Sequence, residues 1–130
     1  MTLHAAILGW RPRTSLDSQN ARVHWARRQK RNVATRVRVA EALAAAAWPR
    51  SLERGGAEHV ITITIYQRLG KLMDSDNAAG CLKKTRDTIA EWLNVDDGQD
   101  GPEWLYRVKR GPDGVALELR LKALREERAG

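Results

Sequence analysis

The sequence has almost no cysteine and no long apolar segment. Its 130 residues include a single cysteine, Cys81, which excludes an intrachain disulfide and a cysteine-ligated zinc site. No apolar run approaches the roughly 20 residues that a membrane-spanning helix requires. Residues 1–10 lack the basic segment and the long apolar segment of a secretory signal peptide. We therefore expect a cytoplasmic protein without a membrane span, in which Cys81 is a small packed residue.

Acidic residues are absent from segment 21–38, although the chain as a whole carries a formal net charge of +7. The basic residues of this segment are Arg22, Arg27, Arg28, Lys30, Arg31, Arg36 and Arg38. Such an excess of positive charge is typical of a protein that binds DNA or RNA. The alternative is a basic helix face that is merely solvated.

Segment 71–101 has the opposite charge balance. Its acidic residues are Asp74, Asp76, Asp87, Glu91, Asp96, Asp97 and Asp100. An acidic patch repels phosphate, so in a nucleic-acid-binding protein it suggests that a cation lies between the carboxylates and the phosphate.

The periodicity of apolar residues predicts six elements of secondary structure. They are a strand over 3–10, a helix from about 20 to 47, a strand over 59–66, a helix over 77–93, and strands over 104–109 and 115–121. The connection at 111–114 is short and rich in glycine, which favours a C-terminal β-hairpin. The predicted class is α+β: a single domain over 1–130, with a small mixed sheet and two helices packed on it. Residues 123–130 are charged and are expected to fray.

The spacing of apolar residues also predicts which face of each helix is buried. For the first helix these residues are Val33, Val37, Ala40, Ala44 and Ala47. For the second they are Ala78, Leu82, Thr85, Ile89 and Leu93.

Two aspartates follow the strand over 59–66. If the chain stays extended there, Asp74 and Asp76 point to the same side, because side chains alternate along a strand. Two close carboxylates repel unless a cation lies between them, and Mg²⁺ prefers such oxygen ligands. The alternative is that Asp76 caps the following helix and Asp74 is a solvated turn residue.

A second acidic pair, Asp96 and Asp97, follows the second helix and supplies a candidate third carboxylate. Its alternative explanation is an ordinary helix exit turn. On the helix, Lys83 and Asp87 are four residues apart, so they share a face and can form an ion pair. The helical phase predicts that Lys83 lies at the edge of the packed face and that Lys84 points to solvent.

These motifs together resemble the RusA family of Holliday-junction resolvases, which is common in phages and prophages. The resemblance covers most of the chain: Asp74-x-Asp76-Asn77, Lys83-x-x-x-Asp87, Asp96-Asp97-Gly98-Gln99, and Asn20, His24 and Trp25 before the basic helix. In one respect the sequence departs from the family, because Gly80 stands where the best-known members have their lysine.

The resemblance implies a homodimeric, Mg²⁺-dependent endonuclease that cuts four-way DNA junctions, with Mn²⁺ expected to substitute. Asp74, Asp76 and either Asp97 or Asp96 are then the metal ligands, and Lys83 is the catalytic lysine, with Lys84 as its rival. We expect phosphate contacts from Arg22, Arg27, Arg28, Lys30 and Arg31. Two other functions remain open: a nucleic-acid-binding module without catalysis, and a phage assembly or adaptor protein.

Overall fold

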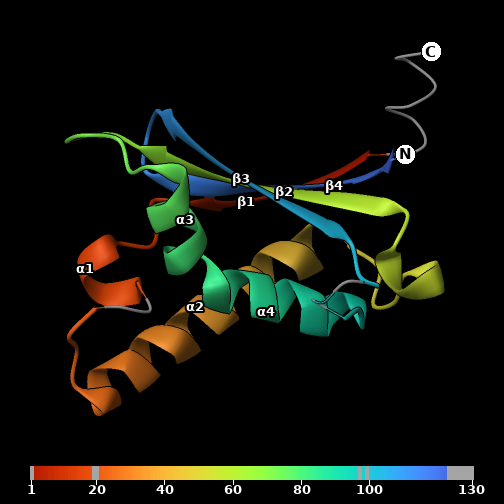
Figure 1. Cartoon of the computed structure of the whole chain (residues 1–130), viewed down its shortest axis with the longest axis horizontal. Coiled ribbons are helices and arrows are strands. Elements are labelled where there is room, and N and C mark those ends of the chain that lie inside the picture. The colour runs from red at the N-terminus through yellow and green to blue at the C-terminus, as the bar shows by residue number, and fades with distance from the viewer. Residues whose placement is uncertain (1, 19–20, 97, 99, 123–130) are drawn as a thin grey trace.

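A computed structural model describes residues 2–18, 21–96, 98 and 100–122. In chain order its elements are β1 (Thr2–Leu8), α1 (Thr14–Asp17), α2 (Trp25–Ala45), the short 3-10 helix η1 (Glu53–Gly56), β2 (His59–Gln67), α3 (Ser75–Cys81), α4 (Lys83–Leu93), β3 (Glu103–Arg110) and β4 (Gly114–Leu121). The predicted α+β class is confirmed, with one mixed sheet and helices packed on it (Figure 1). Segment 123–130, which was expected to fray, lies outside the described residues.

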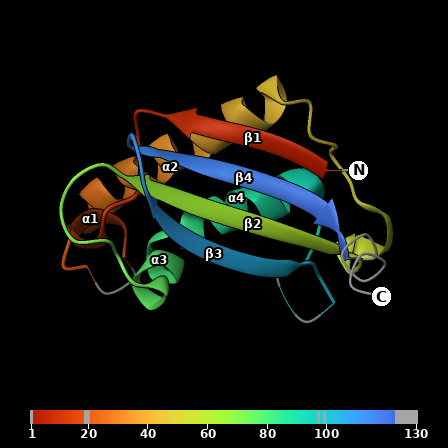
Figure 2. The same cartoon turned by 90° about the horizontal axis from the view of Figure 1, so that it is seen from above.

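The four strands form one sheet in the order β1-β4-β2-β3 (Figure 2). β2 takes a central position because it is rich in β-branched residues and buried along most of its length. It pairs parallel to β3 and antiparallel to β4.

The two predicted C-terminal strands and their short connection are present, but their pairing differs from that of a simple hairpin. β3 and β4 run antiparallel on either side of β2, about 10 Å apart, which is two strand spacings. Their connection crosses the end of β2, where the N–H of Gly111 donates to the carbonyl of Gln67 at 3.3 Å. The prediction of two antiparallel C-terminal strands joined by a short connection is therefore correct, but β2 lies between them in the sheet.

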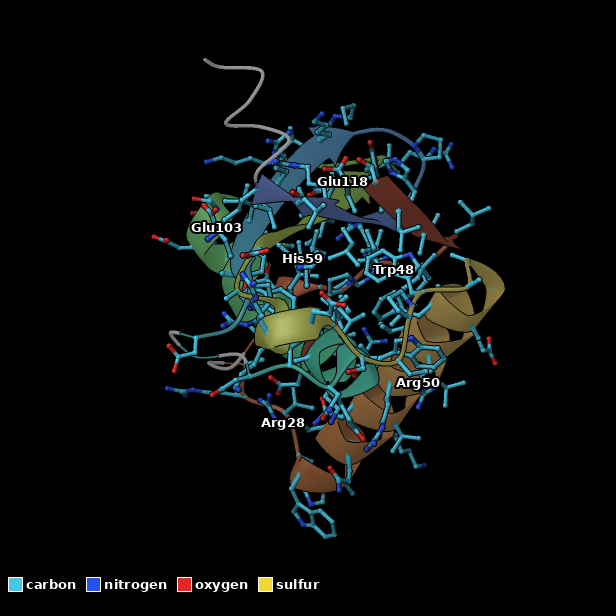
Figure 3. All side chains as sticks on the ribbon, turned by 90° about the vertical axis from the view of Figure 1, so that its right-hand side faces the viewer. Arg28, Trp48, Arg50, His59, Glu103 and Glu118 are labelled. Carbon is cyan, nitrogen blue, oxygen red and sulfur yellow. The ribbon has the colours of Figure 1, made fainter. Side chains whose placement is uncertain are left out.

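The helices of the described residues all lie on one face of the sheet (Figure 1). Alternation along β2 directs Ile61, Ile63 and Ile65 into the core between the sheet and the helices. The other face of the sheet carries polar side chains such as Glu118, which Figure 3 places on the opposite side of the molecule from Arg28 of α2.

The predicted buried face of α2 is wrong. Thr35, Val39 and Leu43 are its buried residues, whereas Val33 and Val37 are 58% and 49% exposed. Helical spacing recurs on both faces of this helix, and the face with larger aliphatic side chains packs because it removes more apolar area from water. Ala44 is exposed, and Ala47 lies beyond the helix end with a positive φ of 56°.

The helix predicted over 77–93 is two helices. α3 and α4 meet at Leu82, whose φ of −94° and ψ of 4° interrupt the helix. The predicted buried face is nevertheless confirmed: Ala78, Leu82, Thr85, Ile89 and Leu93 are all fully buried. The break changes the direction of the chain without removing these side chains from the core.

Two tryptophans join α2, α4 and the sheet. Trp48, buried between the helices and the sheet in Figure 3, donates its indole N–H to the carbonyl of His4 at 3.2 Å. Trp92 donates to the carbonyl of Trp48, also at 3.2 Å. The guanidinium of Arg50 lies 3.7 Å from the centre of a Trp92 ring. These contacts hold α4 against the segment that follows α2 and, through Trp48, against β1.

Cys81 is buried, as expected, and burial raises the pKa of its thiol. Within the described residues, none of the helices is long and apolar enough to span a bilayer.

Candidate metal and nucleic-acid site

A groove of about 560 Å³ lies at the end of β2, where the chain leads into α3. Its lining residues are Arg11, Arg13, Thr14, Ser15, Gln67, Lys71, Leu72, Met73, Asp74 and Asn77. Asp74 is thus an exposed carboxylate in a groove with three cationic side chains. Such a groove is suited to a phosphate, and especially to a phosphate that shares a metal ion with the carboxylate.

The loop that carries Asp74 is held by buried polar contacts. The side-chain amide of Gln67 donates to the carbonyls of Leu69 and Lys71, both at 2.8 Å, and accepts from the N–H of Met73 at 3.3 Å. Gln67 is only 6% exposed. The backbone of the loop is therefore satisfied by a side chain of the sheet, which defines where Asp74 lies.

Asp113, in the β3–β4 connection, fixes the other side of the groove. Its carboxylate accepts from the N–H of Arg68 at 2.9 Å and from Arg11 Nε at 3.2 Å. The hydrogen bond from Arg68 is the main reason that the pKa of Asp113 is lowered, and the guanidinium of Arg11 adds to it. Arg11 is thereby committed to a structural contact, whereas Arg13 keeps only a 3.9 Å approach to Asp113 and is half exposed.

The local structure separates the roles of Asp74 and Asp76. Asp74 is the N-cap of α3, with Oδ1 accepting from the N–H of Asn77 at 2.8 Å, and Asp76 lies in the first helical turn. The extended chain that would point both carboxylates to one side is therefore absent, and the cap is Asp74 rather than Asp76. Asp76 is exposed at the same helix end but does not line the groove.

This pair fits Mg²⁺ in the chemistry of its donors. Oδ1 of Asp74 is used by the cap, but its second oxygen is available, and Asp76 is exposed beside it. Mg²⁺ commonly binds one or two carboxylates and completes its shell with water and phosphate oxygens. Within the described part of the chain, no group of three His, Cys, Asp or Glu side chains is placed to hold a metal.

Asp96, one of the two residues predicted as the third ligand, lies at the opposite end of the sheet. The segment after α4 packs beside η1, at the start of β2, where the N–H of Leu52 donates to the carbonyl of Leu93 at 3.2 Å. β2 and β3 pair from Val60–Glu103 to Gln67–Arg110, a run of strand on the order of 20 Å long. The connection from α4 to β3, which contains Asp96, precedes this run, and the connection from β2 to α3, which contains Asp74, follows it. The two connections lie at opposite ends of the sheet (Figure 2).

Asp96 is therefore not brought to Asp74 and Asp76 within one chain. Its Oδ1 accepts from the N–H of Gly98 at 2.9 Å, so it forms the exit turn that the sequence left as an alternative. Asp97 and Gln99 lie outside the described residues.

The two candidate lysines line a second groove, of about 490 Å³, together with Asp17, Arg28, Asn32 and Asp87. The predicted pair is confirmed, because Lys83 Nζ lies 3.5 Å from Asp87 Oδ2. The predicted exposures are wrong: Lys83 is exposed, and Lys84 is the partly buried one. The interruption at Leu82 resets the helical phase on which that prediction depended.

The predicted phosphate-binding residues divide into two sets. Arg31 forms an ion pair with Asp17, and Arg28 donates to the carbonyls of Ser18 and Ala21. Arg22, Arg27 and Lys30 are exposed, and within the described residues they have no ion pair. Among the predicted phosphate-binding residues, these three are therefore exposed cations without such a structural contact.

Several residues around Asp74 were not among the predicted site residues. They are Arg11, Arg13, Gln67, Lys71 and Asp113. The usable signals were a glutamine at the end of an otherwise β-branched strand and an aspartate in a glycine-rich turn, since both residue types satisfy loop backbones.

Comparison with models of known protein families finds no match, and no curated protein matches the sequence significantly. The relationship to RusA resolvases therefore remains a resemblance of motifs.

Proposed function

We propose that this protein is a Mg²⁺-dependent endonuclease of branched DNA, in which Asp74 and Asp76 are metal ligands. The observation that carries the proposal is the position of Asp74 in a groove with two exposed cations, Arg13 and Lys71. A carboxylate among phosphate-binding cations is the arrangement expected where a metal ion joins protein to phosphate. The RusA-like motifs support the same reaction.

The chain's own residues have defined tasks in this proposal. Arg13 and Lys71 bind and neutralise the DNA backbone, while Gln67 and Asp113 hold the loop and Arg11 in place. Asp74, the N-cap of α3, and Asp76, in its first turn, would hold Mg²⁺. The bound ion would supply a water of lowered pKa and would polarise the phosphoryl oxygen.

The separation of Asp74 from Asp96 adds a requirement to the proposal. A site with three carboxylates would take Asp96 from a second copy of the chain. In a homodimer with two-fold symmetry, the Asp74 end of each copy can meet the Asp96 end of the other copy. Symmetry then creates two equivalent sites. Two such sites match the approximate two-fold symmetry of a four-way junction.

The direct test uses Asp74→Asn and Asp76→Asn. Asparagine also caps helices, so α3 is retained while one metal-binding charge is lost. Single-turnover cleavage of a synthetic four-way junction in Mg²⁺ should fall by at least about 100-fold, since the metal supplies several kcal/mol of transition-state stabilisation. Binding measured in Ca²⁺ should persist. Asp100→Asn, at an exposed turn residue, is the matched control, and undiminished cleavage by Asp76→Asn refutes the assignment.

Mixing variants tests the shared site. An Asp76→Asn chain and an Asp96→Asn/Asp97→Asn chain are each expected to be inactive. Their heterodimer places both substitutions in one site and leaves the other site intact, so mixing should restore part of the cleavage. If the mixture stays inactive although subunits exchange, the carboxylates do not come from two chains.

One observation favours a second function, a nucleic-acid-binding module without catalysis. The described carboxylates do not gather in a group of three. In that case junction binding is retained, Mg²⁺-dependent cleavage by the wild-type protein is absent, and Asp76→Asn changes neither.

A further inference from the structure

Trp25, the first residue of α2, is 75% exposed. The beginning of α2 extends away from the sheet (Figure 1), and the ring of His24 lies 5.9 Å from the Trp25 ring, centre to centre. The indole presents a large aromatic surface to solvent, and tryptophan is enriched at binding surfaces.

Trp25 shares a face of α2 with two residues of the groove that contains the two lysines. Arg28 and Asn32 line that groove and follow Trp25 by three and seven residues, so the three residues lie along one face of the helix. Trp25 therefore lies on this face one helical turn before Arg28.

The groove offers cationic groups for a phosphate. Asp17 is bound by Arg31, and Asp87 pairs with Lys83. Lys84 is half buried in the groove and, among the described residues, has no ion pair. Arg28 uses two of its five N–H donors on backbone carbonyls, which leaves others available.

We propose that Trp25 and this groove form one nucleotide-binding site, in which the indole stacks on an unpaired base and Lys84, with Arg28, binds the adjoining phosphate. The charge of α2 favours an anionic occupant, because the helix has no acidic residue from Trp25 to Ala40 and carries six basic ones. An aromatic surface beside cations is the arrangement that binds single-stranded nucleic acid. The inference rests on the proposed binding of branched DNA. It assigns the recognition of an unpaired base, which a continuous duplex does not offer, to Trp25.

The site explains selectivity for structure rather than sequence. Bases in a continuous duplex are stacked on their neighbours and do not reach an external indole, whereas open junctions, forks and single strands present unpaired bases. Trp25 should therefore add affinity only for DNA with unpaired bases.

The test compares an oligo(dT) strand, a duplex of the same length and an open four-way junction, all in Ca²⁺ at low salt. Trp25→Ala should weaken binding of oligo(dT) and junction about tenfold and of duplex less than about twofold. Trp25→Phe should recover most of the loss. Val33→Ala, which shortens another exposed apolar side chain of α2, should change none of the affinities.

Lys84→Ala should lower the slope of log affinity against log salt for oligo(dT) by about one unit, because one phosphate contact is lost. Lys109→Ala, at an exposed lysine of β3, should leave it unchanged. An equal loss on duplex and oligo(dT), or unchanged DNA binding with altered self-association of Trp25→Ala, overturns the inference.

The two proposals fail in different ways. If the wild-type protein binds DNA in a way that depends on Trp25 but does not cleave it, the nuclease proposal is refuted and the nucleotide-binding site is supported. If cleavage depends on Asp76 and DNA binding does not depend on Trp25, the nuclease proposal is supported and the nucleotide-binding site is refuted.

Discussion

The guanidinium of Arg31 binds the carboxylate of Asp17 through two hydrogen bonds, from Nε to Oδ1 at 3.1 Å and from Nη2 to Oδ2 at 2.5 Å. The N–H of Arg13 also donates to Asp17, at 2.7 Å. The Asp17 side chain is only 8% exposed. This pair attaches α1 to α2.

Arg31→Ala should therefore destabilise the fold by about 1.5–3 kcal/mol, the usual cost of losing hydrogen bonds between charged, partly buried groups. Urea unfolding followed by circular dichroism measures the change. Arg27→Ala, at an exposed residue of the same helix, should cost less than about 0.5 kcal/mol. Equal stabilities of the two variants would show that the Arg31–Asp17 pair contributes nothing.

The available basic residues of α2 make a separate prediction about DNA. Replacing Arg22, Arg27 and Lys30 together by alanine should weaken junction binding and lower the slope of log affinity against log salt by up to about three units. Arg28 and Arg31 belong to structural contacts, so a triple replacement of Arg27, Arg28 and Arg31 mixes folding with binding. An unchanged salt slope would mean that the exposed cations are merely solvated.

The sequence predicted the elements better than the contacts between them. The alternation along β2 and the buried face of α3 and α4 follow from local periodicity, and both are confirmed. Periodicity selected the wrong face of α2, because which face packs depends on side chains contributed by α4 and the sheet.

For the candidate site, the sequence identified Asp74 and the Lys83–Asp87 pair but not their surroundings. Gln67 and Asp113 are 46 residues apart in the chain, and their contacts with one loop follow from sheet order. The break at Leu82 reversed the exposures of Lys83 and Lys84, and no periodic signal marks such a break.

Gln67 gives a prediction about the loop that carries Asp74. Gln67→Leu keeps the volume but leaves the carbonyls of Leu69 and Lys71 and the N–H of Met73 without their partner. The stability should fall by about 1–3 kcal/mol, and the Met73 amide should exchange with deuterium faster. Hydrogen exchange resolved by residue measures the second effect.

Lys109→Ala, which changes the surface of β3, serves as the matched variant for Gln67→Leu. Unaltered exchange at Met73 in Gln67→Leu would contradict the assigned role, because the loop would then hold its shape without the glutamine.

His59 predicts how stability changes in mild acid. It is partly buried at the start of β2, and its Nδ1 has no hydrogen-bond partner among the described residues. Burial lowers the pKa of His59 below its ordinary 6.5, and Glu58 opposes this only in part. As the pH decreases, the unfolded chain therefore takes up a proton at a higher pH than the folded chain does. His59 thus makes the free energy of unfolding fall as the pH decreases below about 6.5.

His59→Gln should remove this contribution to the pH dependence of stability. Urea unfolding at about pH 8 and about pH 5.5 should then show a smaller loss of stability in acid than in the wild type. His4→Gln, at an exposed histidine of β1, should keep the wild-type loss. If both variants lose stability in acid as the wild type does, burial of His59 imposes no cost on its charged form.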